Sequence, residues 1–257
     1  MDREGTAHRP YRIRQRIQEN PKTISLVLDG SVACAPGQFA MLWLPGIDEK
    51  PFSIAGRDPL AFAISRVGPF SAALQALHPG DTLWARGPFG RGFTATPGNT
   101  LLVGGGYGAA PLAFLASALR AECPRIRIEA ALGARSSADL LFAERFDALG
   151  VPVRVATEDG SRGSAGLVTD VVASRLAAGE ISRVRACGPE GMLEAVGRLC
   201  ESAGLDAELS FEAYMRCGVG LCGACEHQGR LVCLDGPVFV KTAALEKSSL
   251  FSHHRVT

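Results

Sequence analysis

Four cysteines gather in one glycine-rich stretch near the end of the 257-residue chain. Cys217, Cys222 and Cys225 form a Cys-x4-Cys-x2-Cys array, and Cys233 follows. This is the thiolate spacing of a plant-type 2Fe–2S cluster, in which four cysteines hold two irons. The interleaved glycines allow the backbone to turn tightly, with its amides free to point at the sulfides. The stretch therefore predicts a one-electron redox centre.

Other interpretations of these cysteines fit the sequence less well. A zinc site usually joins two Cys-x2-Cys pairs, whereas the first pair here is four residues apart. A disulfide framework belongs to secreted chains, and the polar start of this chain lacks the apolar core of a signal peptide. A Rieske site needs two histidines, and only His227 lies nearby, so we expect His227 to be a polar loop residue. Unrelated buried cysteines would not gather among so many glycines.

Composition narrows the class of protein. The 27 basic and 26 acidic side chains give a net charge of +1, which offers no electrostatic reason to expect nucleic acid or an anionic membrane as a partner. No apolar run is long enough to cross a bilayer. Eight cysteines without an export signal favour a reducing compartment, so we expect a cytoplasmic protein.

The elements that must position this centre begin with a barrel. Short apolar runs broken by Pro, Gly and Asp lie at residues 23–28, 39–44, 60–67 and 82–85. Strand-length runs at this spacing predict a small antiparallel β-barrel.

A parallel sheet is predicted next. A buried-type strand at residues 100–103 runs into a glycine turn and a helix, an arrangement that presents backbone amides to a pyrophosphate. Strands at 126–132 and 151–156 flank a predicted helix at 137–149. Glu158 and Asp159 then follow a strand end, where their carboxylates can contact ribose hydroxyls and repel a 2′-phosphate, or simply form a solvated turn.

The order of these stretches resembles the ferredoxin–NADP reductase superfamily. The resemblance implies a flavin lying along a Lys-Pro-Phe-Ser motif, where Lys50 replaces the usual Arg, with phosphate contacts further on, where Ser71 replaces a common Thr. The implied flavin contacts are Lys50, Pro51, Phe52, Ser53, Ile64, Ser65, Arg66, Gly68, Phe70 and Ser71. Physically, Ser53 can hydrogen-bond the flavin edge, Arg66 can pair with phosphate, and Gly68 permits close backbone approach.

The nucleotide half carries the same resemblance. The turn Gly104-Gly-Gly-Tyr-Gly-Ala-Ala-Pro is similar to the superfamily's pyrophosphate turn, with Tyr107 where an aliphatic residue is common. The implied contacts in this turn are Gly104, Gly105, Gly106 and Gly108. Cys187, in a Cys-Gly-Pro turn, would shape the nicotinamide pocket without acting as a nucleophile. By contrast, Cys34, Cys123 and Cys200 are expected to be structural, and His78 is expected at the surface.

The C-terminal motif narrows the resemblance further. A cluster loop that ends in Cys-x-Asp-Gly-Pro-Val-Phe resembles the electron-transfer subunit of the NAD-linked dihydroorotate dehydrogenases, over residues 10–240. This implies FAD, NAD and 2Fe–2S cofactors, no general acid or base, and a catalytic FMN subunit as partner in a heterotetramer. Val219, Leu221 and Phe239 would form the docking face. Alternatives are the corresponding subunit of a hydrogenase, sulfur reductase or NADH–ferredoxin transhydrogenase, or a non-enzymatic zinc-binding interaction module.

The expected architecture is therefore multi-domain, β plus α/β. We predict an antiparallel flavin-binding β-barrel at residues 1–97, a parallel-sheet NAD-binding domain at 98–208, and a small 2Fe–2S domain at 209–257. A paired His253 and His254 near the terminus is expected to be solvent-exposed.

Overall fold

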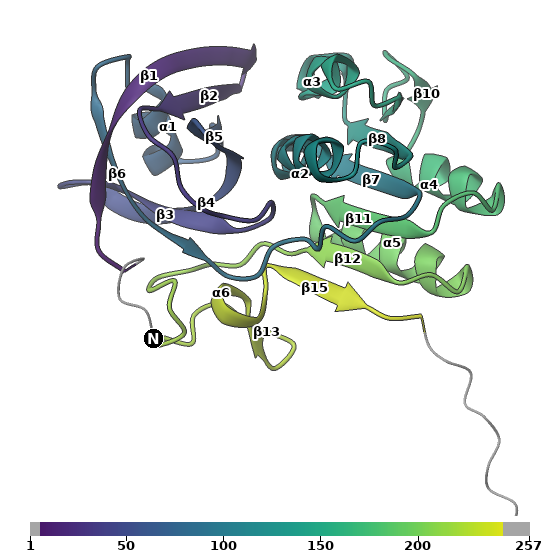
Figure 1. The fold of residues 1–257 in the computed structure, drawn as a ribbon. Helices are drawn as coiled ribbons and strands as arrows, with labels where there is room; N and C mark the ends of the chain where they lie inside the picture. Colours follow the sequence, from purple (N-terminus) through teal and green to yellow (C-terminus); the bar gives the residue numbers. More distant parts are fainter. Residues whose placement is uncertain (1–5, 244–257) are drawn as a thin grey trace, which may run out of the picture.

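The computed structural model describes residues 6–243, which form a barrel, a parallel-sheet domain and a C-terminal segment that contacts both (Figure 1). This confirms the predicted fold class. None of the helices in that range combines the length and the apolar character needed to span a bilayer. His253 and His254 lie outside the described residues.

The barrel is closed by six antiparallel strands. Leu60, Phe62 and Ile64 alternate inward along one strand and are buried, as a period of two requires. A short helix, α1 (Pro69–Gln75), adds Phe70 and Leu74 to the same core. The strands pair in the order β1 (Arg9–Asn20), β2 (Thr23–Leu28), β5 (Leu60–Ser65), β4 (Asp48–Arg57), β3 (Phe39–Leu44) and β6 (Thr82–Phe89).

The second domain is built on a seven-stranded sheet in which only the last strand is antiparallel. Its order is β10 (Ser164–Ala165), β9 (Val153–Thr157), β8 (Ile128–Ala134), β7 (Thr100–Gly105), β11 (Arg183–Cys187), β12 (Ala207–Ser210) and β15 (Val238–Lys241). From β7 the chain adds β8, β9 and β10 on one side, and then adds β11 and β12 on the other side of β7. Open α/β sheets bind ligands at the carboxyl ends of strands at such a switch point.

Two helices cover each face of this sheet. One face packs against α2 (Ala109–Glu122) and α3 (Ala143–Ala148), and the other against α4 (Val168–Ala177) and α5 (Glu190–Ser202). The α2 helix is buried nearly all round because it also packs against the barrel, where Phe114 joins the barrel core. Two 3-10 turns, η2 (Gly106–Gly108) and η3 (Ser137–Asp139), follow β7 and β8.

The predicted helix at residues 137–149 is interrupted in the structure. The η3 turn ends at Asp139, and α3 begins only at Ala143. Between them Phe142 adopts a left-handed conformation with φ of 64°, which is unusual for a bulky residue. Phe142 is buried, and the Arg145 guanidinium lies 4.5 Å from the centre of its ring. Tertiary packing of this ring therefore accompanies the break in the helical pattern.

The C-terminal segment leaves the sheet after β12 and returns to it. It contains the short hairpin β13 (Glu226–His227) and β14 (Arg230–Leu231), followed by α6 (Val232–Asp235). The chain then pairs β15 with β12 at the edge of the large sheet. Residues 238–241 are thus part of that sheet, although the predicted domain bounds assign them to the cluster domain; those bounds remain predictions.

A buried arginine connects the sheet to the linker from the barrel. The Arg185 side chain is 1% exposed and donates to Glu208 at 2.7 Å and to the Thr100 hydroxyl at 3.0 Å. It also donates to the Thr94 carbonyl at 2.8 Å and to the Thr96 hydroxyl at 2.9 Å. All of these acceptors lie around one planar guanidinium, which a lysine cannot replace.

Candidate functional site

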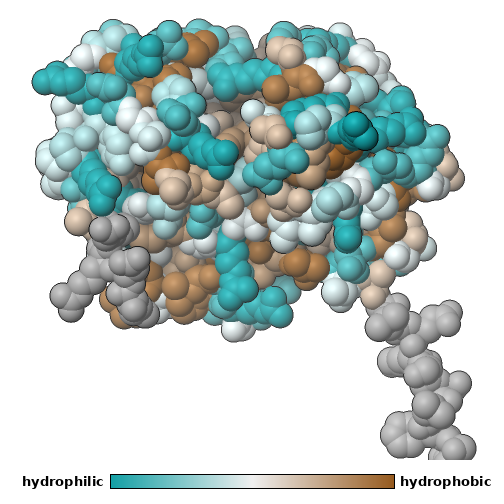
Figure 2. Space-filling view, viewed as in Figure 1, coloured by the Kyte–Doolittle hydropathy of each residue, from teal (hydrophilic) through white to brown (hydrophobic). Residues whose placement is uncertain are grey.

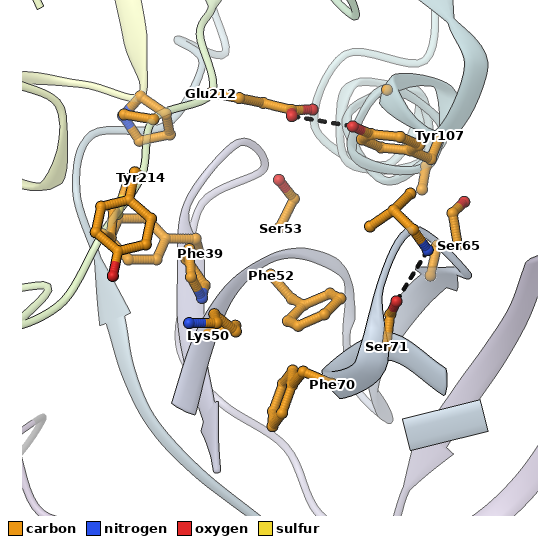
Figure 3. A pocket seen from close by; sticks show the side chains of 18 of the residues that line it. Phe39, Lys50, Phe52, Ser53, Ser65, Phe70, Ser71, Tyr107, Glu212 and Tyr214 are labelled. Atoms are coloured by element: carbon orange, nitrogen blue, oxygen red, sulfur yellow. Dashed lines mark hydrogen bonds between the residues drawn. The ribbon is translucent and has the colours of Figure 1, made fainter. Parts of the chain in front are cut away.

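A pocket of about 540 Å³ lies where the barrel, the parallel-sheet domain and the segment after β12 meet (Figure 3). Its size and largely apolar lining are typical of cofactor sites. Of the residues predicted from the sequence, ten line it: Lys50, Pro51, Phe52, Ser53, Ser65, Gly68, Phe70, Ser71, Gly108 and Cys187.

The β4 strand forms one wall of this pocket. The Lys50 ammonium pairs with Asp48 at 2.7 Å and lies 5.6 Å from the centre of the Tyr214 ring. The ring of Phe52 packs on that of Phe70, with centroids 6.2 Å apart. The wall therefore combines an aromatic surface with one cation.

The turn from β5 into α1 forms the adjoining wall. The Ser71 hydroxyl accepts hydrogen bonds from the backbone N–H groups of Val67 at 2.9 Å and Gly68 at 3.0 Å, which fixes the turn. Ser65 lines the pocket, but its neighbours do not: Ile64 is buried in the barrel core and Arg66 is exposed. The structure thus brings together most, though not all, of this predicted stretch.

The glycine turn after β7 packs directly against the Cys187 turn after β11. Gly104 and Gly105 end β7, and Gly106 has φ of 55°; none of the three lines the pocket. Gly108 does line it, and a Cβ there would lie 2.3 Å from the Cys187 carbonyl oxygen. Only glycine allows these two turns to meet at the switch point of the sheet.

Cys187 is buried at the end of β11. Burial raises the pKa of its thiol to about 12, against a smaller opposing effect of the Ser210 hydrogen bond. The group therefore stays protonated at neutral pH, which agrees with a role in shaping the pocket and not with a nucleophilic one.

Two further pocket residues, Tyr107 and Glu212, were not among the predicted contacts. The Tyr107 hydroxyl donates to the Glu212 carboxylate at 3.0 Å across the pocket, as the dashed line in Figure 3 shows. Partial desolvation raises the pKa of the Glu212 carboxyl, and the hydrogen bond from Tyr107 lowers it by less, so the pKa is raised overall. In the sequence, the feature that could have pointed to Glu212 is its position just after the last parallel strand.

Glu158 and Asp159 lie in the exposed turn after β9, outside the pocket. The Asp159 carboxylate accepts hydrogen bonds from the Ser161 hydroxyl at 2.6 Å and from its N–H at 3.0 Å. These bonds lower the pKa of Asp159. The turn is at the carboxyl edge of the sheet, as predicted from the sequence.

The four clustered cysteines form two pairs. The thiols of Cys217 and Cys222 lie within hydrogen-bonding reach of each other, as do those of Cys225 and Cys233. Within residues 6–243, no three His, Cys, Asp or Glu side chains converge as they would around a single metal ion. Cys217 also lies within electrostatic reach of Cys233, so the two pairs are neighbours in one loop.

Backbone amides point at these sulfurs. The Leu221 N–H lies 3.3 Å from the Cys217 sulfur, and the Gly220 N–H lies 3.2 Å from the Cys233 sulfur. Burial alone would raise the pKa of Cys217, but such backbone donors outweigh it and bring the value to about 6. Cys217 therefore favours the thiolate, the form that binds iron, whereas burial raises the pKa of Cys233 to about 12.

The pocket and the cysteines share one wall. Phe39 and Met215 line the pocket, and both also pack in the apolar cluster that contains Cys225 and Cys233. Phe39 and Met215 are 3% and 5% exposed, so both are buried where the two sites adjoin.

Comparisons with known proteins identify the family. Residues 212–243 match the iron–sulfur cluster binding domain of dihydroorotate dehydrogenase B, and residues 102–198 match the oxidoreductase NAD-binding domain. A Methanocaldococcus jannaschii protein named probable dihydroorotate dehydrogenase B (NAD(+)), electron transfer subunit, is 38% identical, over 89% of this chain and 88% of its own length. A Pyrococcus abyssi protein of the same name is 44% identical, over 79% of this chain and 78% of its own. This chain belongs to the family of dihydroorotate dehydrogenase B electron transfer subunits.

Solved structures share the fold of this chain. A chain from the structure of an NADH-dependent reduced ferredoxin–NADP oxidoreductase, a flavin-based bifurcating enzyme, aligns with a TM-score of 0.80 and 27% identity, over 90% of this chain and 88% of that one. The cytochrome b5 reductase domain of Ulva prolifera nitrate reductase shares the fold at a TM-score of 0.63 and 17% identity, over 78% and 94% of the two chains. The chain is thus an oxidoreductase of the electron transfer subunit family, with FAD, NAD and a 2Fe–2S cluster as its cofactors.

Proposed function

We propose that this chain carries electrons between NAD(H) and the FMN-containing catalytic subunit of a dihydroorotate dehydrogenase, in pyrimidine biosynthesis. A bound flavin supplies the central chemistry, since flavins exchange electron pairs with NAD(H) and single electrons with iron–sulfur clusters. The protein's own task is to bind, orient and shield these groups.

The pocket residues would hold the flavin. Lys50, Pro51, Phe52 and Ser53 of β4 would lie along its ring, since they form one continuous wall of the pocket. The phosphates would lie along the β5–α1 turn. The proposed contacts there are Ile64, Ser65, Arg66, Gly68, Phe70 and Ser71, of which all but Ile64 and Arg66 line the pocket.

The dinucleotide would approach from the carboxyl edge of the sheet. The glycine turn 104–108 would face its pyrophosphate, and Cys187 would shape the pocket for the nicotinamide. Glu158 and Asp159 would accept hydrogen bonds from ribose hydroxyls. Because their carboxylates would repel a 2′-phosphate, we propose NAD and not NADP as the substrate.

Each cysteine pair would bind one iron. Cys217 and Cys222 would hold the first, and Cys225 and Cys233 the second, as their pairing suggests. The amides aimed at the sulfurs would raise the reduction potential relative to a loop without them.

The catalytic partner would dock over the cluster loop, and the complex would be a cytoplasmic heterotetramer of two copies of each subunit. Leu221 is 86% exposed, and Val219 and Phe239 lie in the same segment, half-buried. Figure 2 shows apolar side chains at the lower edge of this face, over the segment between β12 and β15. An exposed apolar patch of this kind is typical of a binding surface.

The shared wall of Phe39 and Met215 is the observation that carries this proposal, because it places a cofactor-sized pocket directly beside the paired cysteines. The test is to co-express the chain with its catalytic subunit and to measure NAD⁺ reduction by dihydroorotate. Cys222→Ser should lose iron and this activity while the protein keeps its flavin. Cys123→Ser, outside the loop, should keep both. A colourless protein that binds zinc would overturn the proposal.

The similarity to the bifurcating ferredoxin–NADP oxidoreductase supports a second candidate function. A subunit of that kind would exchange electrons with a ferredoxin-linked partner. If the chain purifies from its native cell with a ferredoxin-linked subunit, and dihydroorotate does not reduce its flavin, this second function replaces the first.

A further inference from the structure

The β1–β2 hairpin of the barrel reaches the parallel-sheet domain, and its tip faces α3 at the top of Figure 1. The Lys22 ammonium, in the turn of the hairpin, pairs with the Asp139 carboxylate of η3 at 2.8 Å. In a second pair, the Arg145 guanidinium of α3 binds Glu19 of β1 and also donates to the Ser25 hydroxyl of β2 at 3.1 Å. Two ion pairs of opposite polarity therefore connect the domains at a place that the proposed function leaves unused.

The turn of this hairpin is also bonded to the flavin side of the molecule. The Lys22 carbonyl accepts hydrogen bonds from the Arg66 N–H at 2.9 Å and from the Gln75 side-chain amide at 2.8 Å. Both donors belong to the stretch from β5 through α1, which would carry the flavin phosphates under the proposed function. Lys22 is thus held by its backbone to the flavin side and by its side chain to the parallel-sheet domain.

From Asp139 the hydrogen bonds continue to the turn after β9. Ser136 donates to Asp139 at 2.9 Å, and the N–H of the next residue, Ser137, donates to the Ser161 hydroxyl at 2.7 Å. That hydroxyl donates in turn to the Asp159 carboxylate at 2.6 Å, which would accept from a ribose under the proposed function. A continuous connection therefore runs from the flavin side to the ribose side, and none of its residues lines the pocket.

We propose that the β1–β2 hairpin couples the two cofactor sites, with Lys22 as a positioning residue that holds η3, and through it the Asp159 turn, in place for the adenosine ribose. This inference rests on the proposed function, since it takes FAD and NAD(H) as the two ligands. Each ligand orders one of the two turns that the hairpin joins, so each favours the state in which the ion pairs are formed. Binding of one ligand then strengthens binding of the other by the same factor.

The coupling through the hairpin must be separated from direct contact between the two cofactors. A nicotinamide ring that touches the flavin would couple the ligands without any help from the protein. ADP-ribose keeps the adenosine and the pyrophosphate of the dinucleotide but has no nicotinamide ring to stack on the flavin. Its effect on flavin binding therefore reports on the protein.

The test measures flavin retention by the flavin-loaded protein. Samples are diluted with and without saturating ADP-ribose, and the released flavin is followed by its fluorescence. In the unmodified protein, ADP-ribose should lower the flavin dissociation constant about 2- to 5-fold, the range expected for an exposed ion pair. Lys22→Met should bring this factor close to one. Lys22→Glu combined with Asp139→Lys, which reverses the pair, should restore part of it, whereas a variant that had merely lost packing would not recover.

The matched control is Lys241→Met. It makes the same chemical change and removes the exposed pair of Lys241 with Glu201, at 3.1 Å, within the parallel-sheet domain. It should leave the coupling factor unchanged. If ADP-ribose binds the unmodified protein without changing flavin retention, or if Lys22→Met keeps the full factor, the inference is overturned but the proposed function is not. A flavin-loaded protein that binds neither NAD⁺ nor ADP-ribose would overturn both.

Discussion

Gly108 is the residue at which the two ligand-facing turns of the parallel-sheet domain touch. A methyl group there would lie 2.3 Å from the Cys187 carbonyl oxygen and 2.5 Å from its carbon, both backbone atoms that cannot move independently. We expect Gly108→Ala to destabilise the protein by about 1–3 kcal/mol, the usual cost of overpacking, and to weaken dinucleotide binding by separating the turns.

The control for this substitution is Gly191→Ala in the first turn of α5. Beyond its chain neighbours and its own helix backbone, no atom lies within 4 Å of a Cβ built at Gly191, and alanine favours the helix. The melting temperature should therefore fall for Gly108→Ala and should not fall for Gly191→Ala. Equal melting temperatures for the two variants would mean that the turns adjust freely.

Glu49 provides a pH-dependent contact on the barrel. Burial alone raises its pKa, but hydrogen bonds from Arg86 at 2.7 and 2.9 Å and from His8 at 2.7 Å outweigh this, and the pKa is held below the ordinary 4.5. Because the folded state favours the carboxylate, the contribution of Glu49 to stability is complete well above pH 4.5 and is lost as the pH falls through the depressed value.

We therefore expect Glu49→Gln to cost about 1 kcal/mol at pH 7, since the group is partly solvated, and progressively less below pH 4.5. Urea denaturation of both proteins between pH 7 and pH 3 measures this difference. A difference that stays constant across the range would show that ionisation of Glu49 is not the cause.

At the scale of elements, the hydrogen bonds of Arg185 join β11 to its neighbouring strands and to the linker from the barrel. Its guanidinium is fully buried and serves acceptors on β12, β7 and the 94–96 segment. Arg185→Met would leave Glu208 without its cationic partner, and we expect a loss of about 3–5 kcal/mol. Arg183→Met, an exposed site on the same strand, should change stability little. Chemical denaturation and the rate of proteolysis at the linker would both report the difference.

The sequence predicted those elements whose pattern is local. Strands such as β2 and β3 alternate or form short apolar runs between turn residues, so their bounds follow closely from the sequence. The break before α3 was missed because the left-handed conformation of Phe142 depends on tertiary packing that no local pattern shows. The β15 strand was also missed, since only its long-range pairing with β12 defines it.

The same distinction applies to the site. The cysteine array and the Lys50–Ser53 motif each lie within one short stretch of the sequence, so spacing and resemblance revealed them. Tyr107 and Glu212 are far apart in the sequence, and only the fold brings them together. Arg66 shows the converse: a basic residue in the right stretch that the structure leaves exposed and outside the pocket.

At the scale of the whole molecule, the proposed docking face can be tested by placing one charged side chain in it. Leu221 is 86% exposed at the tip of the cluster loop, where an interface would bury it. We expect Leu221→Asp to weaken the complex with the catalytic subunit by at least about 10-fold, as loss of a buried apolar anchor does. Ile17→Asp, on an exposed part of β1, is the control. Size-exclusion chromatography of the mixed subunits gives the answer, and an intact complex with Leu221→Asp would place the interface elsewhere.

The return of the chain to the sheet at β15 limits how this protein can be divided. Everything between β12 and β15, the four cysteines included, is inserted between two neighbouring strands that pair with each other. Truncation after residue 210 would therefore expose the edge of β12 as well as remove the iron site. A transplant of the loop into another reductase would need a host sheet with an equivalent pair of strands to anchor both of its ends.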